Sequence, residues 1–403
     1  MKNLLIMLIL LLACPCIGQM SKSGSFSGQD KFFEIKYEDI LKNKKVVLLS
    51  QVASNVEYIK LETNKDCLIG GIRECLFTDN LIFINNKDHI LKFSRDGKFL
   101  QKIGSPGRGP GEIDLIRTMS LIPEKKMIAV QKNAIREIMY FSFDGAVIKT
   151  VKIPDALYIK VMNDGRFIAY DAGADGFNKN TFSLINENGD TISAIKNYCT
   201  WKNTSGMVLM AGTYPMPFTS KNNWYFKDRY YDTIYTVFSN KIIPSYAIKL
   251  GKYRLPDELR LERLGPNNTQ VFKEKAPNYF YTTLFESAGK LFIVSNCFGK
   301  GENKYLLYDK QERIGTLLNN GSNSSTGFIN DLDAGIDFWP IGVVNDNQVY
   351  RPLNIVSLKK ELENKSEEIA AKYPDKKKAL EKLISESDIS DNPILMIVTL
   401  ISR

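Results

Sequence analysis

Histidine is almost absent from this chain of 403 residues, because His89 is the only one. A Ser-His-Asp arrangement would have to use this residue as its base, and a metal site built from several histidines is excluded. His89 stands just before a predicted strand, which favours a structural role. The sequence therefore predicts no catalytic residue and no cofactor.

Metal-binding patterns are also missing. The six cysteines form no C-x-x-C beyond the signal region, which excludes the usual zinc site. The clustered aspartates in DLDAGID (331–337) and DAGAD (171–175) lack the full ligand pattern of a calcium loop. We therefore predict no metal. Cys67 and Cys75 are close in sequence, and the sequence allows either a disulfide between them or two buried free thiols.

Long apolar runs are absent except at the N-terminus. Residues 4–13 (LLIMLILLLA) are too few to span a bilayer and are typical of a secretory signal peptide, which we assign to residues 1–13. The string Leu11-Leu12-Ala13-Cys14 is similar to a bacterial lipobox, with cleavage before Cys14 and lipid on its sulfur. Two acyl chains would hold the protein at a membrane. Ordinary cleavage without lipid is the alternative.

The region after Cys14 reads as a spacer. Residues 15–30 are rich in Ser and Gly, which predicts a flexible tether, and we assign 14–54 to the lipidated cysteine, the tether and an N-terminal extension. The formal charge of +9 favours anionic partners in general. Because the chain is exported, we expect no nucleic-acid partner, and contact with the membrane only through the lipid.

Hairpin turns recur along the chain. One series includes Asp96-Gly97, Asp144-Gly145 and Asn188-Gly189, each between two short β-type segments. A second hairpin lies upstream of each, as at Asp79-Asn80 and Asp164-Gly165. Both series repeat at about 40 to 70 residues, so each unit holds four strands, the signature of a propeller blade.

The ring needs strands from both chain ends. Five units lie between about 70 and 320, and 337–356 supplies half of a sixth. The apolar segments that begin at Val56 and Pro393 would complete it and remove exposed sheet edges. We therefore expect an all-β protein, a six-bladed β-propeller of four-stranded antiparallel blades over 55–403, closed by N- and C-terminal strands.

Two segments break the strand pattern. Residues 255–275 contain a short helix candidate after Pro256, and 357–387 show helical spacing of apolar residues, interrupted at Pro374. We interpret both as short helical insertions on the rim or face of the propeller.

The glycine-rich loop GSPGRGPGEI (104–113) is not a phosphate-binding loop, because no Gly-Lys-Ser/Thr follows and the next apolar segment is a strand candidate. Glycine here supplies positive φ angles where the chain passes from one blade to the next. Arg108 and Glu112 could still project into a ligand groove, and we keep both as ligand-binding candidates.

The combination of several strings resembles a known family. Residues 58–113, Tyr231–Tyr235, Phe338-Trp339-Pro340 and Asn392–Leu395 are similar to the six-bladed β-propeller lipoproteins of Bacteroidetes, relatives of NHL-repeat and TolB-like propellers. The resemblance implies this fold and an envelope location, and it carries over no catalytic residues. Surface-exported members often have acidic residues just after the lipidated cysteine. Residues 15–19 have none, so we expect the periplasmic side.

Binding is the predicted activity. A propeller gathers loops at one end of its channel, and aromatic and arginine side chains suit sugars and acidic groups. The candidates by type are Trp201, Tyr214, Trp224, Arg229 and Trp339, with packing between blades as the alternative for each. We predict a monomeric, non-enzymatic binding or scaffold module for a glycan, a peptide or a partner envelope protein. The alternative is a glycan-active envelope hydrolase or lyase with its site in the channel.

Overall fold

The computed structural model describes residues 32–109, 111–132, 137–153, 156–171, 178–198, 200, 217–262, 268–319, 327–363 and 369–402. From Phe32 onward the chain forms one compact unit. Cys14, Asp175, Trp201 and Tyr214 lie outside the described residues, so the predictions made for them stay predictions.

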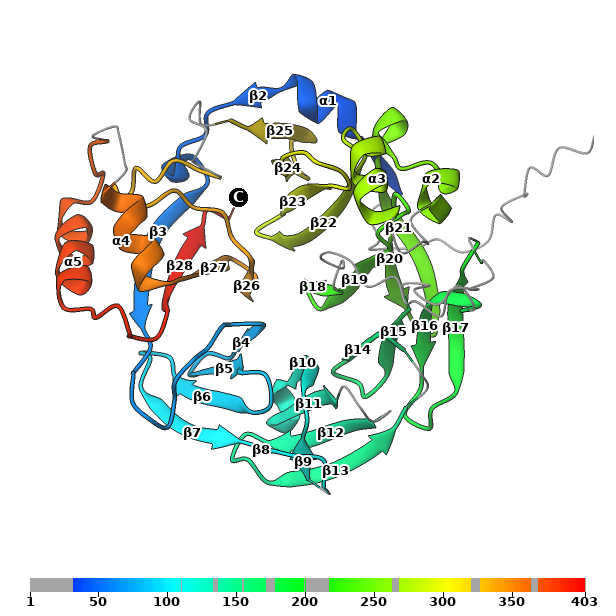
Figure 1. The fold of residues 1–403 in the computed structure, drawn as a ribbon, viewed down its shortest axis with the longest axis horizontal. Coiled ribbons are helices and arrows are strands. Elements are labelled where there is room, and N and C mark those ends of the chain that lie inside the picture. The colour runs from blue at the N-terminus through cyan, green and yellow to red at the C-terminus, as the bar shows by residue number, and fades with distance from the viewer. Residues whose placement is uncertain are drawn as a thin grey trace, which may run out of the picture. The chain divides into compact units, whose positions relative to one another are not determined.

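Six small antiparallel sheets form a ring (Figure 1). Each blade contains four antiparallel strands, the first nearest the centre and the fourth at the rim. The predicted six-bladed β-propeller is confirmed.

The first three blades follow one another along the chain. Blade 1 consists of β4 (Cys75–Phe77), β5 (Leu81–Asn85), β6 (Ile90–Ser94) and β7 (Phe99–Ile103). Blade 2 consists of β10 (Ile116–Ile122), β11 (Met127–Lys132), β12 (Glu137–Ser142) and β13 (Val147–Lys152). Blade 3 consists of β14 (Tyr158–Val161), β15 (Phe167–Tyr170), β16 (Asn180–Ile185) and β17 (Thr191–Lys196).

The other three blades include both ends of the unit. Blade 4 consists of β18 (Phe218–Ser220), β19 (Asn223–Lys227), β20 (Thr233–Phe238) and β21 (Lys241–Lys249). Blade 5 consists of β22 (Phe280–Ser287), β23 (Lys290–Cys297), β24 (Lys304–Asp309) and β25 (Ile314–Leu318). Blade 6 consists of β26 (Gly342–Asn345), β27 (Gln348–Leu353), β28 (Ile394–Leu400) and β3 (Ala53–Lys60).

The Asp-Gly turns have the backbone that hairpins require. Gly97 and Gly145 have φ angles of +89° and +87°, which glycine adopts without the strain that a Cβ would cause. At Gly97 a Cβ would also lie 2.2 Å from the carbonyl oxygen of Lys60. The hairpin of blade 1 therefore packs directly against the end of β3, and glycine is needed there.

The core lies between neighbouring blades. Middle strands such as β6 and β12 are buried on both faces, whereas the rim strands β13 and β17 are almost wholly exposed. A middle strand is covered by a neighbouring blade on each face. Its apolar side chains therefore follow one another along the strand instead of alternating with polar ones. Burial of this apolar surface between blades is the main force that holds the ring together.

Blade 6 closes the ring with strands from both ends of the described unit. β28 pairs with β27 on one side and with β3 on the other, with Val398 opposite Val56 and Ile394 opposite Lys60. Six of the seven residues of β28 are buried. The last strand of the chain is thus a core strand, and the N-terminal strand β3 covers its outer edge.

The segment before β3 runs along the rim (Figure 1). β1 (Phe33–Lys36) pairs in parallel with β21, and after α1 (Tyr37–Lys42) β2 (Lys44–Lys45) pairs in parallel with β25. The short 3-10 helix η1 (Leu49–Gln51) then leads into β3. These rim strands were not predicted from the sequence, because β1 and β2 are too short to give a clear pattern.

The helical insertions are confirmed. The first contains α2 (Asp257–Glu262) and α3 (Asn268–Lys275), and the second contains α4 (Ile355–Glu363) and α5 (Pro374–Ser385). Pro374 opens α5 at a position where the missing N–H costs no helical hydrogen bond. None of the helices in the described ranges is long and apolar enough to cross a membrane.

Candidate ligand-binding face

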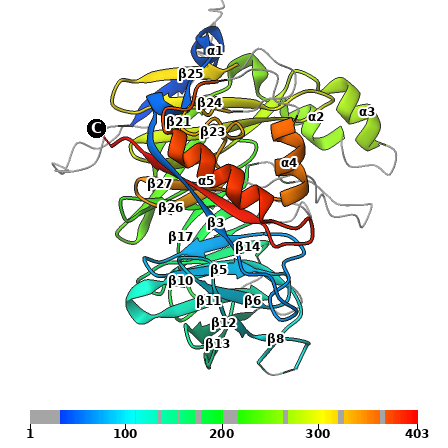
Figure 2. The ribbon, with the colours of Figure 1, turned by 90° about the vertical axis from the view of Figure 1, so that its left-hand side faces the viewer.

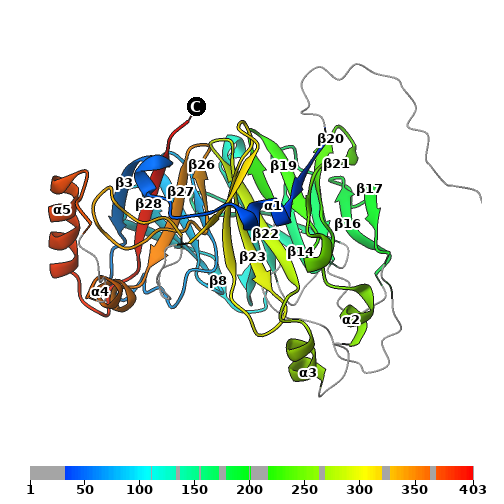
Figure 3. The ribbon, with the colours of Figure 1, turned by 90° about the horizontal axis from the view of Figure 1, so that it is seen from above.

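The long connections gather on one face of the ring. In antiparallel blades, the connections between second and third strands and those between blades lie on the same face, which we call the loop face. It holds α2, α3 and α4 and the small parallel pair of β8 (Ser105–Pro106) with β9 (Glu112–Ile113) (Figures 2 and 3). Short turns such as Asp96-Gly97 occupy the opposite face. Binding loops on a rigid scaffold usually cluster in this way.

Arg108 and Glu112 lie on the connection between blades 1 and 2, at the rim (Figure 1). The Glu112 carboxylate accepts a hydrogen bond of 2.7 Å from the backbone N–H of Gly109, so it organises its own loop. The Arg108 side chain is exposed. The loop is the predicted joint between two blades.

The two described tryptophans lie in different interfaces between blades. Trp224 of β19 is half-buried against the core between blades 3 and 4. Trp339 is 6% exposed, and its ring lies 5.0 Å from Tyr305, 5.8 Å from Phe328 and 5.9 Å from Phe292. Trp339 thus has the packing role that was the alternative to ligand binding.

Arg229 lies in a stack of aromatic and guanidinium groups beneath the loop face. Its guanidinium lies 4.6 Å from the ring centre of Tyr281, which is 4.9 Å from the ring of Phe298. The ring of Phe298 also stacks on the ring of Tyr230, with 5.7 Å between the ring centres. The guanidinium of Arg260 lies 3.9 Å from the centre of the Tyr230 ring. Cation–π contacts of this kind hold arginines rigidly. The stack joins blades 4 and 5 to α2.

Charged groups are buried beside this stack. The Lys227 side chain is almost fully buried, and its Nζ donates a hydrogen bond of 2.9 Å to the carbonyl oxygen of Asp228. Burial lowers the pKa of Lys227 to about 8. Burial also raises the pKa of Asp232. The hydroxyl of Tyr170 donates to the Asp228 carboxylate at 3.2 Å. Perturbed groups of this kind often mark functional sites, although structural networks also produce them.

A cavity of about 440 Å³ opens on the loop face between η3 (Gly251–Tyr253) and α3. Its lining combines aromatic, cationic and polar side chains: Lys252, Tyr253, Glu274, Lys275, Pro277, Asn278 and Tyr279. The volume falls within the usual range for small-ligand sites.

Ion pairs hold two of these lining side chains in place. Lys252 pairs with Glu38 of α1 at 3.2 Å, and Glu274 pairs with Lys300 at 3.2 Å. Tyr253 and Tyr279 are half-buried aromatic side chains in this lining, with the Lys252 ammonium 5.4 Å from the centre of the Tyr253 ring, and Asn278 adds an amide. Sugars bind to such combinations of aromatic faces and polar groups. We call this cavity the rim pocket.

The sequence did not single out the rim-pocket residues. They come from both ends of the insertion that was predicted over 255–275, and only the fold brings Lys252 and Tyr253 next to Lys275 and Tyr279. The sequence offered one signal for this pocket, which was the predicted helical insertion over 255–275 between two blades. The five ligand-binding candidates that lie within the described residues, by contrast, are distributed over separate parts of the ring.

The clustered aspartates of the segment 331–337 have hydrogen-bond partners within the fold. In the ranges that the structure describes, no group of three His, Cys, Asp or Glu side chains could hold a metal ion. Asp331 accepts hydrogen bonds from the N–H (2.8 Å) and hydroxyl (2.5 Å) of Ser50. Asp333 accepts from the Asn330 side chain at 2.6 Å and from the N–H of Gly335 at 2.9 Å.

The remaining reactive side chains have structural partners. His89 contacts the Asp88 carboxylate at 2.6 Å and the Asn86 amide at 3.0 Å. Cys67 and Cys75 are both buried and are free thiols. Burial raises the pKa of the Cys75 thiol well above its usual range, which makes it unreactive.

The fold defines this chain as a six-bladed β-propeller. It belongs to the family described as a domain of unknown function, DUF4934, which matches residues 32–399. No curated protein matches the chain.

The solved structures that resemble it include two from Bacteroides species. A Bacteroides fragilis protein described as exported is 20% identical, with a TM-score of 0.70 over 91% of this chain and 99% of that one. A member of the DUF4221 family from Bacteroides vulgatus is 10% identical, with a TM-score of 0.49 over 87% of this chain and 98% of that one. The predicted resemblance to six-bladed propellers of Bacteroidetes is thereby confirmed. The similarity to the Bacteroides fragilis structure supports the fold.

Proposed function

We propose that this protein is a lipid-anchored, non-enzymatic binding module of the cell envelope, held through Cys14 on the periplasmic side. Its ligand site is the rim pocket. The observation that carries the proposal is the position of this pocket on the face that collects the long connections and helices of the ring. A similar solved structure is described as exported, which supports the location.

An oligosaccharide with an anionic group suits the rim pocket best. Tyr253 and Tyr279 can stack on sugar rings. Lys252, Lys275 and Lys300 bring three positive charges to the lining and its ion pairs, against the two carboxylates of Glu38 and Glu274. The excess positive charge favours a carboxylate or sulfate on the sugar. A peptide or a partner protein is the competing ligand class.

The test is a thermal-shift screen of the soluble chain (residues 20–403) with acidic and neutral oligosaccharides. Ligand that binds only the folded state raises the melting temperature. We expect a rise with an acidic oligosaccharide, and its loss in Lys275→Gln and Tyr279→Ala. Lys125→Gln, on the opposite face, is the matched control and should keep the rise. If no acidic or neutral glycan shifts the wild-type protein, the glycan assignment is wrong.

The anchor is tested separately. Cys14→Ser should release the protein from the membrane fraction and abolish incorporation of labelled palmitate, while the folded domain keeps its melting temperature. A Cys14→Ser protein that stays in the membrane fraction would contradict the lipid anchor.

A further inference from the structure

The rim of the propeller is protected on one half of the ring. In blades 4 and 5 the outer edge carries an additional parallel strand, β1 on β21 and β2 on β25. In blade 6, α5 and the residues before it lie against β3. There Lys376 donates to the carbonyl oxygen of Val56 at 2.9 Å, and Tyr373 donates to that of Ser54 at 3.4 Å. The chain itself thus satisfies these edges.

Blades 2 and 3 have no such cover in the part of the chain that the structure describes. Among the described residues, no strand pairs with the outer edge of β13 or β17. At the outer edge of β7 in blade 1, one backbone donor has a partner, because the Glu62 carboxylate accepts a hydrogen bond of 2.9 Å from the N–H of Phe99. An exposed strand edge presents a row of unpaired backbone donors and acceptors, which is a template for another strand.

The β13 edge combines apolar and basic side chains. Val147 and Ile148 are 48% and 47% exposed. Lys149 and Lys152 are exposed as well, and Lys149 covers the ring of Tyr140 at 4.8 Å. Within the described ranges neither lysine forms an ion pair. The edge therefore suits a strand that brings apolar side chains and negative charge.

β1 shows what such a strand looks like. Its residues alternate between apolar Phe33 and Ile35 and charged Glu34 and Lys36. Ile35 is 2% exposed against blade 5, and Glu34 pairs at 3.2 Å with Lys249, the last residue of the strand that β1 covers. An edge strand ending in lysine is thus covered, in this same fold, by an apolar strand that carries a glutamate.

We propose that the outer edge of β13 binds an extended apolar segment of a partner protein that carries two acidic residues three positions apart. The segment adds to blade 2 as a fifth strand, parallel to β13 as β1 is to β21. Lys149 and Lys152 are also three positions apart and so lie on opposite faces of β13, and one acidic residue pairs with each. A second copy of this chain is a poor occupant, because two β13 edges would place lysines against lysines. This surface is separate from the rim pocket and does not depend on its ligand.

The test is amide hydrogen exchange of the soluble chain with a six-residue peptide of valines that has glutamate at its second and fifth positions. We expect slower exchange at Val147–Lys152 and unchanged exchange at the covered strand β21. The double variant Lys149→Glu and Lys152→Glu should bind this peptide about tenfold more weakly, because two surface ion pairs become repulsions. It should instead bind a valine–lysine peptide. Its melting temperature verifies that it is folded.

Three results with the peptides would overturn the proposal. They are absence of protection at β13, equal binding of both peptides by both proteins, and protection confined to β17. Protection of β13 that rises with protein concentration and needs no peptide would also overturn it, because it would mean pairing between two copies. A reversal of peptide preference on charge reversal supports it.

Discussion

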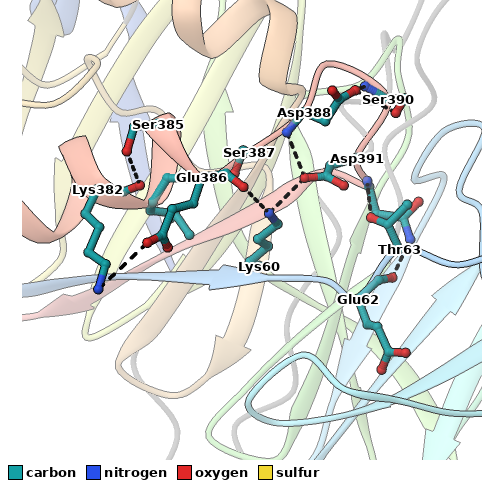
Figure 4. A network of polar contacts seen from close by, with 12 residues as sticks. Lys60, Glu62, Thr63, Lys382, Ser385, Glu386, Ser387, Asp388, Ser390 and Asp391 are labelled. Carbon is teal, nitrogen blue, oxygen red and sulfur yellow. Dashed lines mark hydrogen bonds and ion pairs between the residues drawn. The ribbon is translucent and has the colours of Figure 1, made fainter.

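Lys60 of β3 forms an ion pair with Asp391, with 2.8 Å between Nζ and Oδ2 (Figure 4). The same ammonium donates to the carbonyl oxygen of Glu386 at 3.1 Å. These contacts join the rim strand of blade 6 to the segment that leads from α5 into β28. The neighbouring Asn392 is 3% exposed, and its side-chain amide donates to the carbonyl oxygens of Glu62 and Cys67 at 2.7 and 2.8 Å.

Asp391→Asn should weaken this junction slightly. The hydrogen bond from Lys60 lowers the pKa of the Asp391 carboxyl, so its contribution to folding is present above the ordinary aspartate pKa and disappears as the pH falls through the lowered one. We expect a loss below about 1 kcal/mol at pH 7, because the pair is near the surface. Urea unfolding at pH 7 and pH 3 measures it. A loss that is equal at both pH values would contradict the ion-pair account.

Deleting residues 393–403 should abolish cooperative folding. The deletion removes β28, whose buried side chains and hydrogen bonds to both β27 and β3 complete blade 6. Without it the ring has two open edges at the closing blade. Deletion of 401–403 alone is the control and should melt like the full chain. If the longer deletion melts with the same sharp transition, the closure by β28 is not needed for folding.

Trp339→Ala should destabilise the protein much more than Trp224→Ala. Trp339 is enclosed by aromatic rings in the core, so its removal leaves a cavity and costs about 3 to 5 kcal/mol. Trp224 is half-buried and should cost about half as much. Urea titration of both variants gives the comparison. Equal losses would show that the burial difference does not determine stability here.

The blade pattern was readable from the sequence because each blade repeats the same local chemistry. Asp96-Gly97 and Asp144-Gly145 need positive φ at glycine, and the apolar segments on either side are too short for helices. Proline at 374 likewise marks the start of α5. Local rules of this kind act over a few residues and survive in a single sequence.

The rim strands and the rim pocket were not readable, because both depend on residues far apart in the chain. β1 is a strand only because β21, more than two hundred residues later, offers it an edge. Lys252 and Tyr279 line one pocket only because η3 and α3 fold back on each other. Arg229 was a candidate by residue type, and its place on the ring of Tyr281 could be known only from the fold.

Lys227 should make stability rise with pH in the alkaline range. Burial lowers its pKa in the folded state to about 8, against the ordinary value of 10.5 in an unfolded chain. Below pH 8 the lysine is charged in both states, and the folded state bears the full desolvation cost. As the pH rises from 8 to 10.5 the folded state loses its proton first, so the cost disappears.

Lys227→Met tests this, because methionine fills a similar volume without a charge. The charged groups that face Lys227 are Asp228, Asp232 and Arg254, and all three remain in the variant. Between pH 8 and 10.5, we expect the free energy of unfolding of the wild-type protein to rise by on the order of 3 kcal/mol relative to that of the variant. Urea titrations at intervals of half a pH unit measure the difference, in which the titration of the tyrosines cancels. Parallel curves for the two proteins would mean that Lys227 keeps an ordinary pKa in the folded state.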